Sequence, residues 1–300
     1  MNAQRFTATL LLSAAVLVAI LAGVGTGDSF AVPGSLWGEP ASASPRTAFG
    51  PPVTFGGGTA KTFVTQDEKG QPTTLGVVLS AAALERPPTH STHHGDVETI
   101  EEGGMTTVAF PIALAFPADA KHAPYTYTSL AWNPQGHAPR SIYDRPHFDL
   151  HFYMVSEAEV NAIDPSDPAF EKKAARAKTP MAAYVPARYV ATPDAIPRMG
   201  VHWVDAASPE LNGQPFTATF LYGFWDGKMV FVEPMITTAY LKSVKRAPGQ
   251  VVRFDVQQPK TFERPGFYPT AYSIRYDSGR DEYVIALEGL QQHRPARARS

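Results

Sequence analysis

The sequence predicts a mainly β fold, an antiparallel barrel or sandwich of about ten strands with a few short helices. Three observations support this prediction. The 300 residues include 28 Pro and 23 Gly, which end helices and occupy turns. They also include 17 Phe and 12 Tyr, residue types that are enriched in strands. Short apolar or alternating runs recur between turn signals, as is typical of antiparallel sheets.

Composition excludes several classes of protein. Hydrophobic residues make up 44% of the chain, enough to bury a core, so disorder throughout is excluded. A formal net charge of -2 provides no electrostatic basis for binding nucleic acid or an anionic membrane surface, and we expect neither as a partner. The chain has no cysteine, which excludes disulfides and thiolate sites. Any metal must therefore be bound through nitrogen and oxygen.

The amino-terminal segment has the pattern of an export signal. Residues 6–25 are apolar and uncharged, Arg5 precedes them, and Ser29–Ala31 is a small-x-small cleavage pattern. We expect residues 1–31 to be a signal peptide. The alternative is an uncleaved anchor, because the run is just long enough to span a bilayer. Both alternatives predict an exported protein, either periplasmic or extracellular.

The rest of the chain is expected to form one domain. Residues 32–52 mix Gly, Pro, Ala and Ser without a period, and we expect a linker there. Residues 53–293 are predicted to be a single β-rich domain. The basic residues 294–300 are predicted to be a disordered tail.

The first part of this domain is predicted to contain four strands and one short helix. Ser80 is expected to cap the helix over 81–85, which the following prolines end. The strands are predicted over residues 59–65, 74–79, 106–116 and 125–132.

Three histidines, His90, His93 and His94, lie in a loop rich in Thr, Ser and Gly that continues into Glu101 and Glu102. A zinc site is one interpretation of this loop. Nothing in it defines a ligand geometry, however, and a solvated loop is the simpler interpretation.

Residues 146–154 are the most informative stretch of the chain. Their alternation predicts one strand, because successive side chains of a strand point to opposite faces. One face is apolar and is expected to be core: Phe148, Leu150, Phe152 and Met154. The other face carries a row of polar side chains: His147, Asp149, His151 and Tyr153. His137, in the turn that precedes this strand, is expected at the rim of whatever the row faces.

The remaining elements are predicted from caps and turns. Ser156 and Glu159 form a capping box before a short helix, and a second helix is expected to begin at Asp167. Residues 184–190 are predicted to be an edge or a loop, because prolines surround them. Further strands are predicted over residues 199–205, 216–224, 229–236, 251–256, 271–276 and 282–287.

Asp226-Gly227 is the strongest hairpin signal in the chain. Counting outward from this turn predicts that Phe220 faces Glu233, which puts the carboxylate on an aromatic face. An unpaired buried carboxylate is costly, so Glu233 is expected to need a cation, a hydrogen-bond donor or a raised pKa.

His147 and His151 are four residues apart, roughly 13 Å on a straight strand at about 3.3 Å per residue, so one ion is hard to reach from both. Three arrangements stay open. A bulge brings the two histidines together, or Asp149 shares an ion with one of them, or the row is a metal-free network. His202 and Glu233 add further ligand types of a catalytic zinc or non-haem iron site. The predicted metal residues are His147, His151, His202, Glu233 and Asp149, and the predicted ion is a divalent transition metal, zinc first.

Several motifs resemble a family of exported bacterial proteins that is classed only as a domain of unknown function. The motifs are Trp132-Asn133-Pro134-x-Gly136-His137, Pro146-His147-Phe148-Asp149-x-His151-Phe152-Tyr153, Met199-Gly200-x-His202-Trp203 and Phe231-x-Glu233-Pro234-Met235. The family's crystallised representative is under the control of an extracytoplasmic stress sigma factor. The resemblance covers most of residues 55–290. It implies an exported, β-rich domain that forms homo-oligomers and is linked to envelope stress, and it implies no activity.

Two functions are therefore left open by the sequence. One is a metal-dependent enzyme, in which an open position on the bound ion activates water or a small exported substrate. The other is a non-enzymatic binding or assembly protein of the envelope, in which the polar row is a structural network.

Overall fold

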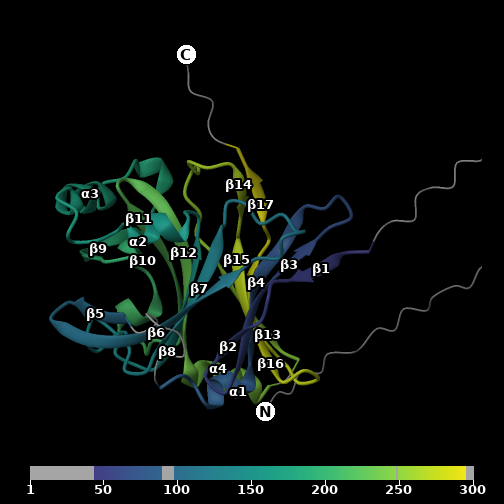
Figure 1. Ribbon diagram of the computed structural model, residues 1–300. Coiled ribbons are helices and arrows are strands. Elements are labelled where there is room, and N and C mark those ends of the chain that lie inside the picture. Colours follow the sequence, from purple (N-terminus) through teal and green to yellow (C-terminus); the bar gives the residue numbers. More distant parts are fainter. Residues whose placement is uncertain (1–43, 90–97, 248, 295–300) are drawn as a thin grey trace, which may run out of the picture. The chain divides into compact units, whose positions relative to one another are not determined.

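Two β-sheets pack face to face in the part of the chain that the computed structural model describes, residues 44–89, 98–247 and 249–294 (Figure 1). These residues belong to one unit, residues 42–300, which is separate from residues 1–41. The predicted signal peptide, the loop that carries His90, His93 and His94, and residues 295–300 lie outside the described residues.

The prediction of a mainly β fold is confirmed. Strands account for 46% of the described residues and helices for 14%. The described residues form seventeen strands, more than the ten predicted, because short edge strands pair beside the long ones.

The first sheet has seven strands in the order β1-β3-β4-β16-β15-β13, and β2 also pairs with β3. Its strands are β1 (Arg46–Phe49), β2 (Val53–Phe55), β3 (Gly58–Gln66), β4 (Pro72–Ser80), β13 (Val251–Asp255), β15 (Ala271–Asp277) and β16 (Glu282–Glu288). The sequence predicts a linker over residues 32–52, but residues 46–49 of that segment instead form β1. They do so because they align with β3, and Ala48 packs into the core.

The second sheet has eight strands in the order β5-β6-β7-β8-β12-β11-β10-β9. Its strands are β5 (Glu98–Glu102), β6 (Met105–Ala115), β7 (Tyr127–Asn133), β8 (His147–Tyr153), β9 (Tyr189–Ile196), β10 (Gly200–Asp205), β11 (Ala218–Trp225) and β12 (Lys228–Thr237). A separate ribbon pairs β14 (Gly266–Tyr268) with β17 (Gln291–His293).

The eight-stranded sheet curls until its two edges approach each other, so it resembles a nearly closed barrel. The backbone N–H of Gly103, in the β5–β6 turn, donates a hydrogen bond of 3.2 Å to Asp194 Oδ2 on β9. All seven residues of β8 are buried as a result. One face of this strand meets the seven-stranded sheet, and the other faces the inside of the curl.

The apolar face of β8 lies in the core between the sheets, as the alternation predicts. Phe148 packs against Phe55 of β2, with ring centroids 6.2 Å apart. Farther along the interface, Phe220 of β11 stacks on Tyr272 of β15 at 5.5 Å. Burial of these side chains is the main favourable term that holds the two sheets together.

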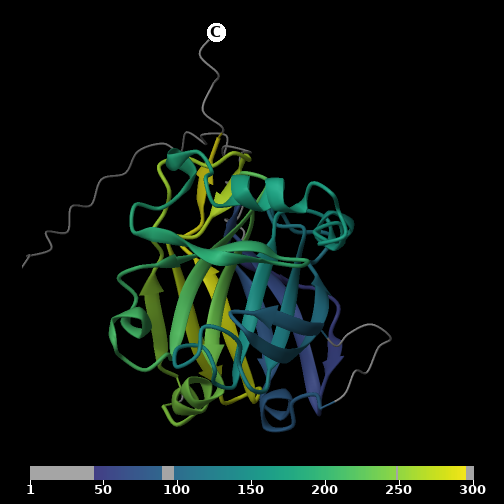
Figure 2. The same cartoon turned by 90° about the vertical axis from the view of Figure 1, so that its left-hand side faces the viewer.

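The α-helices of the described residues lie at the ends of the sheets and number four: α1 (Ala81–Glu85), α2 (Glu157–Asn161), α3 (Phe170–Ala177) and α4 (Thr238–Lys245). In both views α1 and α4 lie at one end of the molecule, and the β14–β17 ribbon lies at the other (Figures 1 and 2). The capping box of Ser156 and Glu159 is present as predicted. The helix predicted from Asp167 begins later, at Phe170, because residues 167–169 form a turn in which the Asp167 carboxylate accepts from the Ala169 N–H. Among the described helices, none has the length and apolar character needed to cross a membrane.

The predicted hairpin at Asp226-Gly227 forms, but the register counted from it is wrong beyond its first two pairs. Phe224 pairs with Met229, whereas Gly223 pairs with Phe231, so β12 has one extra residue at this point. Gly223 permits the shift because the Phe231 ring packs on its backbone, where a Cβ atom would come within 2.1 Å of the ring. Leu221, and not Phe220, therefore pairs with Glu233.

Candidate metal centre

The bulge decides the side of the sheet on which Glu233 lies. Phe220 points into the core between the two sheets, whereas Glu233 shares the inner face of the curl with Phe231. The register between β12 and β8 places Glu233 beside His151. Glu233 is only 1% exposed, so the expectation that its carboxyl group needs a partner applies on this face as well.

The polar side chains of the inner face fall into two clusters. We call His151, His202 and Glu233 the Glu233 cluster, and His137, His147 and Asp149 the Asp149 cluster. In each cluster, one ligand atom from each of the three residues lies within 4.8 Å of the others.

The Glu233 cluster draws on three strands of the curled sheet. His151 comes from β8, Glu233 from the neighbouring β12, and His202 from β10. Three strand spacings of about 4.8 Å would separate β8 from β10 in a flat sheet. The curl instead brings the rings of His151 and His202 to a centroid distance of 6.1 Å. The Phe231 ring lies against both imidazoles, at 4.7 and 5.3 Å.

The polar atoms of the Glu233 cluster are close together but not hydrogen bonded. His151 Nε2 lies 3.3 Å from Glu233 Oε1, and His202 Nε2 lies 3.5 Å from Glu233 Oε2. Among the described residues, neither His151 Nε2 nor Glu233 Oε2 has a hydrogen-bond partner, and both atoms are buried. Burial lowers the pKa of His151 to about 4 and that of His202 to about 3, so both rings are neutral at pH 7. Burial also raises the pKa of Glu233 well above its ordinary value.

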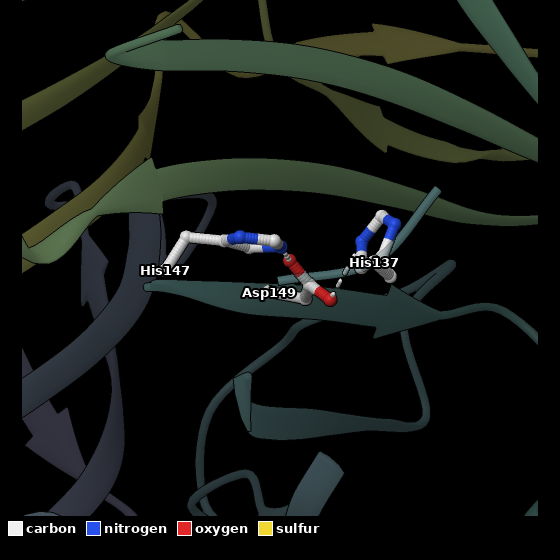
Figure 3. Close-up of side chains that lie close together, drawn as sticks. All are labelled: His137, His147 and Asp149. Carbon is white, nitrogen blue, oxygen red and sulfur yellow. Dashed lines mark ion pairs between the residues drawn. The ribbon is translucent and has the colours of Figure 1, made fainter. Parts of the chain in front are cut away.

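The Asp149 cluster places one carboxylate between two imidazoles (Figure 3). Asp149 Oδ1 lies 3.0 Å from His147 Nε2, and Oδ2 lies 3.6 Å from His137 Nε2. The side-chain amide of Asn133 donates a hydrogen bond of 2.7 Å to the same Oδ2. This carboxylate therefore has a buried donor, which Glu233 lacks among the described residues.

Backbone carbonyls fix the orientation of both rings in the Asp149 cluster. His147 Nδ1 lies 2.6 Å from the Arg145 carbonyl, and His137 Nδ1 lies 2.8 Å from the Ala138 carbonyl. Since a carbonyl oxygen only accepts, each Nδ1 must carry a proton, and each Nε2 is left facing Asp149. This arrangement suits a metal-ligating histidine, and it equally suits a cationic histidine beside a carboxylate.

The charges of the Asp149 cluster balance within the cluster. Burial opposes a charge on His137, but Asp149 outweighs it and raises the pKa of His137 to about 9. Burial likewise opposes ionisation of Asp149, but the two histidines hold the pKa of the carboxyl group well below its ordinary value. A cationic His137 therefore faces an ionised Asp149 at neutral pH.

The Glu233 cluster and two members of the Asp149 cluster, His137 and Asp149, line one narrow cavity of about 30 Å³. Tyr143, Leu221 and Met199 contribute to its walls, and Glu102 lies at its edge. Burial raises the pKa of Glu102 to about 7, although the nearby His137 opposes the shift. A cavity of this size has room for one water molecule.

The predicted metal residues are thus all buried or nearly buried on one inner face, but they do not form one site. His147 and Asp149 join His137, whereas His151, His202 and Glu233 stay together. This division follows from the strand geometry that makes one ion hard to reach from both His147 and His151. It corresponds to the arrangement in which Asp149 shares a site with only one of the two histidines, which here is His147.

Sequence reasoning missed one partner of Asp149 and one of His137. Asn133 was not among the predicted site residues, although its cross-strand pairing with His147 puts it on the polar face. Glu102 was assigned to a solvated loop, but its side chain lies 3.6 Å from His137 at the edge of the cavity. The only signal for these residues was their proximity in sequence to His137 and to the loop histidines.

No family model matches the chain, and no curated protein or solved structure matches it. The resemblance to the exported family therefore stays a prediction.

Proposed function

We propose that the Glu233 cluster binds a divalent transition-metal ion, zinc first, and that the ion activates a bound water molecule for hydrolytic chemistry. The observation that supports this proposal most directly is the unpartnered pair of buried atoms, His151 Nε2 and Glu233 Oε2, in a cluster that offers its carboxyl group no donor among the described residues. His147 Nε2 and Asp149 Oδ1 also lack hydrogen-bond partners there, but the Asp149 carboxylate accepts from Asn133 through its other oxygen. Two neutral imidazoles cannot neutralise a carboxylate, and a cation bound among the three can. Two histidines and a glutamate are also the protein ligands of known catalytic zinc sites.

The ligand atoms lie close enough together to reach one ion, although the two nitrogen–oxygen distances involve different oxygens of Glu233. Bonds of about 2.0–2.2 Å to zinc place neighbouring tetrahedral ligands about 3.3–3.5 Å apart. The two nitrogen–oxygen distances in the cluster are 3.3 and 3.5 Å. Three protein ligands leave a fourth position for water, and zinc lowers the pKa of a bound water to about 7.

A second candidate function is a non-enzymatic binding or assembly role, which the Asp149 cluster favours. Its carboxylate already has Asn133 as a donor and His137 as a counter-charge. A row that satisfies its own charges can serve to hold the curl together without an ion.

We also propose that the protein acts outside the cytoplasm, in an envelope stress response. The export pattern of residues 1–31 and the family resemblance support this part of the proposal. Sequencing the amino terminus of protein recovered from outside the cytoplasmic membrane tests it. A start near Val32 supports cleavage, whereas recovery only from the cytoplasm contradicts export.

Elemental analysis of the purified chain tests the ion. We expect close to one equivalent of zinc or another transition metal, and we expect His151→Ala to lose it. His122→Ala is the matched control, because His122 lies outside both clusters and stacks on Phe116. Metal-free protein whose melting temperature does not respond to zinc would contradict the proposal and favour the non-enzymatic role.

Hydrolysis of p-nitrophenyl acetate tests the chemistry separately. The metal-loaded chain should hydrolyse this small activated ester, and chelation or His151→Ala should abolish the activity. A chain that binds the ion but does not accelerate hydrolysis would retain the metal site and contradict the hydrolytic role.

A further inference from the structure

A hollow of about 240 Å³ lies on the outer face of the seven-stranded sheet, the face turned away from the curled sheet. Side chains of β1, β3, β4, β15 and β16 line it, together with Arg280 of the β15–β16 turn. No residue of the Glu233 cluster or the Asp149 cluster lines it. The hollow is therefore separate from the proposed metal centre, and its chemistry does not depend on an ion.

The floor of the hollow is apolar on a face where polar side chains are usual. Val77 of β4 and Ile285 of β16 point into the core, so the next residues along these strands, Val78 and Val284, point outward. With Phe63 of β3, the two valines belong to a small apolar cluster of their own. The free face of an antiparallel sheet is commonly polar. This cluster therefore provides a surface on which an apolar group can lie.

An exposed aromatic ring stands beside this floor. Phe49 of β1 lines the hollow and is 44% exposed, and its ring centroid lies 6.5 Å from that of Phe63. Phe63 itself is only 7% exposed. A flat ring that enters the hollow can contact both phenyl rings, and aromatic pairs are more favourable than their buried area alone predicts. These contacts favour an aromatic ligand.

The charged groups around the floor differ in how well they are partnered. The Asp277 carboxylate accepts from two backbone N–H groups of its own turn, at 3.0 and 3.3 Å. The Glu282 carboxylate accepts from Lys61 Nζ at 3.3 Å. The Arg280 guanidinium, by contrast, has neither a hydrogen bond nor an ion pair within the described part of the chain. A ligand that accepts hydrogen bonds can therefore use Arg280 without displacing a partner.

The count of charges favours an anion. Arg275 and Arg280 line the hollow together with Asp277 and Glu282, and Lys61 pairs with Glu282 from beside it. Three cations and two carboxylates leave one positive charge. Arg275 Nη1 lies 3.8 Å from Asp277 Oδ2, beyond hydrogen-bond distance. The planar fork of a guanidinium matches a carboxylate, so the residues present in the chain favour a monocarboxylate.

We propose that this hollow binds a flat aromatic monocarboxylate. A cavity of about 150 Å³ takes benzene, so the larger hollow suits a ring system of about ten non-hydrogen atoms, the size of naphthalene. The ring lies on Phe63, Val78 and Val284 beside Phe49, and the carboxylate accepts from Arg280. This binding site is a further function of the chain, independent of the proposed hydrolysis.

Equilibrium dialysis of the full chain with 2-naphthoate, in the presence of a chelator, tests the proposal. We expect saturable binding with a dissociation constant of about 1 mM or lower, as an ordinary ligand efficiency gives for a molecule of this size. 2-Naphthamide has the same ring without the charge and should bind at least about tenfold more weakly. Arg280→Gln removes the charged donor and should weaken naphthoate binding about tenfold to a hundredfold, with little effect on the amide.

Arg253→Gln is the matched control, because Arg253 is a half-exposed arginine of β13 on the same sheet that does not line the hollow. This variant should bind 2-naphthoate like the parent, and so should His151→Ala. An equal loss in Arg253→Gln would show unspecific charge attraction and overturn the site. Loss in His151→Ala would place the ligand at the metal centre and overturn it as well.

Two further results would contradict the proposal. Equal binding of 2-naphthamide would overturn the carboxylate class, and the absence of saturable binding would overturn the site itself. Neither result bears on the ion, which elemental analysis of the chain decides separately.

Discussion

The Asp149 cluster and the Glu233 cluster place the same residue types against one cavity, yet they hold their carboxyl groups in opposite states. Asp149 has the Asn133 amide and two histidines around it, and its pKa is held well below its ordinary value. Glu233 has two neutral histidines and no donor among the described residues, and burial raises its pKa. Each carboxyl group is almost fully buried, so burial alone does not explain the difference.

The difference shows that neighbouring donors and charges, rather than ligand identity, decide what a buried histidine–carboxylate cluster can do. The Asp149 cluster supplies its carboxylate with a donor, Asn133, and a counter-charge, His137, which suits a structural role, although Asp149 Oδ1 has no hydrogen-bond partner among the described residues. The Glu233 cluster is left with a buried acid and an unpartnered imidazole nitrogen, His151 Nε2, which suits an added cation. Four measurements test this contrast, in order of decreasing expected effect.

Asp149→Ala should give the largest loss of stability. It leaves His137 and the Asn133 amide buried without their shared partner, and breaking a buried charged pair costs about 3–5 kcal/mol. For a domain of this size, that lowers the melting temperature by roughly 6–20 °C. Thermal unfolding of metal-free protein measures the effect. Glu233→Ala should cost less under the same conditions, and an equal or larger loss at Glu233 would break the contrast.

Glu233→Gln should remove the ion without unfolding the protein. The amide keeps the size of the side chain and needs no counter-charge, so the metal-free variant should melt close to the metal-free parent. Zinc should stabilise the parent by about 2.7 kcal/mol at one hundred times its dissociation constant, and the variant far less. Calorimetric titration with zinc measures both affinities. Asp149→Asn is the matched comparison, and this variant should still bind zinc. If Asp149→Asn loses zinc and Glu233→Gln keeps it, the Asp149 cluster is the metal site.

The Asp149 cluster should weaken in alkaline solution. The pKa of His137 is raised to about 9, so its contribution to stability is fully present below the unfolded value near 6.5 and is lost as the pH rises through about 9. Each unit of the shift corresponds to about 1.4 kcal/mol. The difference in melting temperature between the parent and His137→Gln should therefore shrink between pH 7 and pH 10. A constant difference would show that His137 is not held as a cation.

Zinc binding should release a proton from Glu233. The pKa of Glu233 is higher in the metal-free fold than in the unfolded chain. This fold is therefore favoured below the pKa of the unfolded carboxyl group, and it loses that stability as the pH rises through the pKa of the folded one. A bound ion stabilises the ionised carboxylate and so prevents this loss of stability. The increase in melting temperature on adding zinc should therefore grow with pH. The affinity should rise about tenfold per pH unit while Glu233 holds its proton. Calorimetry in buffers of different ionisation enthalpy counts the protons, and none released would show that Glu233 is already ionised.

Local patterns in the sequence predicted much of the fold because they depend on neighbours along the chain. Alternation along residues 147–153 identified both faces of β8, since strand geometry alone sets the side on which each side chain lies. The Asp226-Gly227 turn and the Ser156 capping box are likewise local. The helix α4 was not predicted, because its eight residues follow β12 directly and carry few signals beyond the cap at Thr237.

The grouping of the polar residues was decided only by the tertiary structure. Gly223 accepts the Phe231 ring and shifts the hairpin by one residue, which moves Glu233 to the inner face. The curl of the sheet brings His202 to His151 although two strands lie between theirs, and it brings Glu102 to His137. Bulges and curl arise from the packing of many side chains at once, so no short stretch of sequence encodes them. The sequence by itself therefore predicted five of the six side chains of the two clusters and placed His137 only at their rim. Tertiary packing decided that they form two clusters and which carboxyl group lacks a counter-charge.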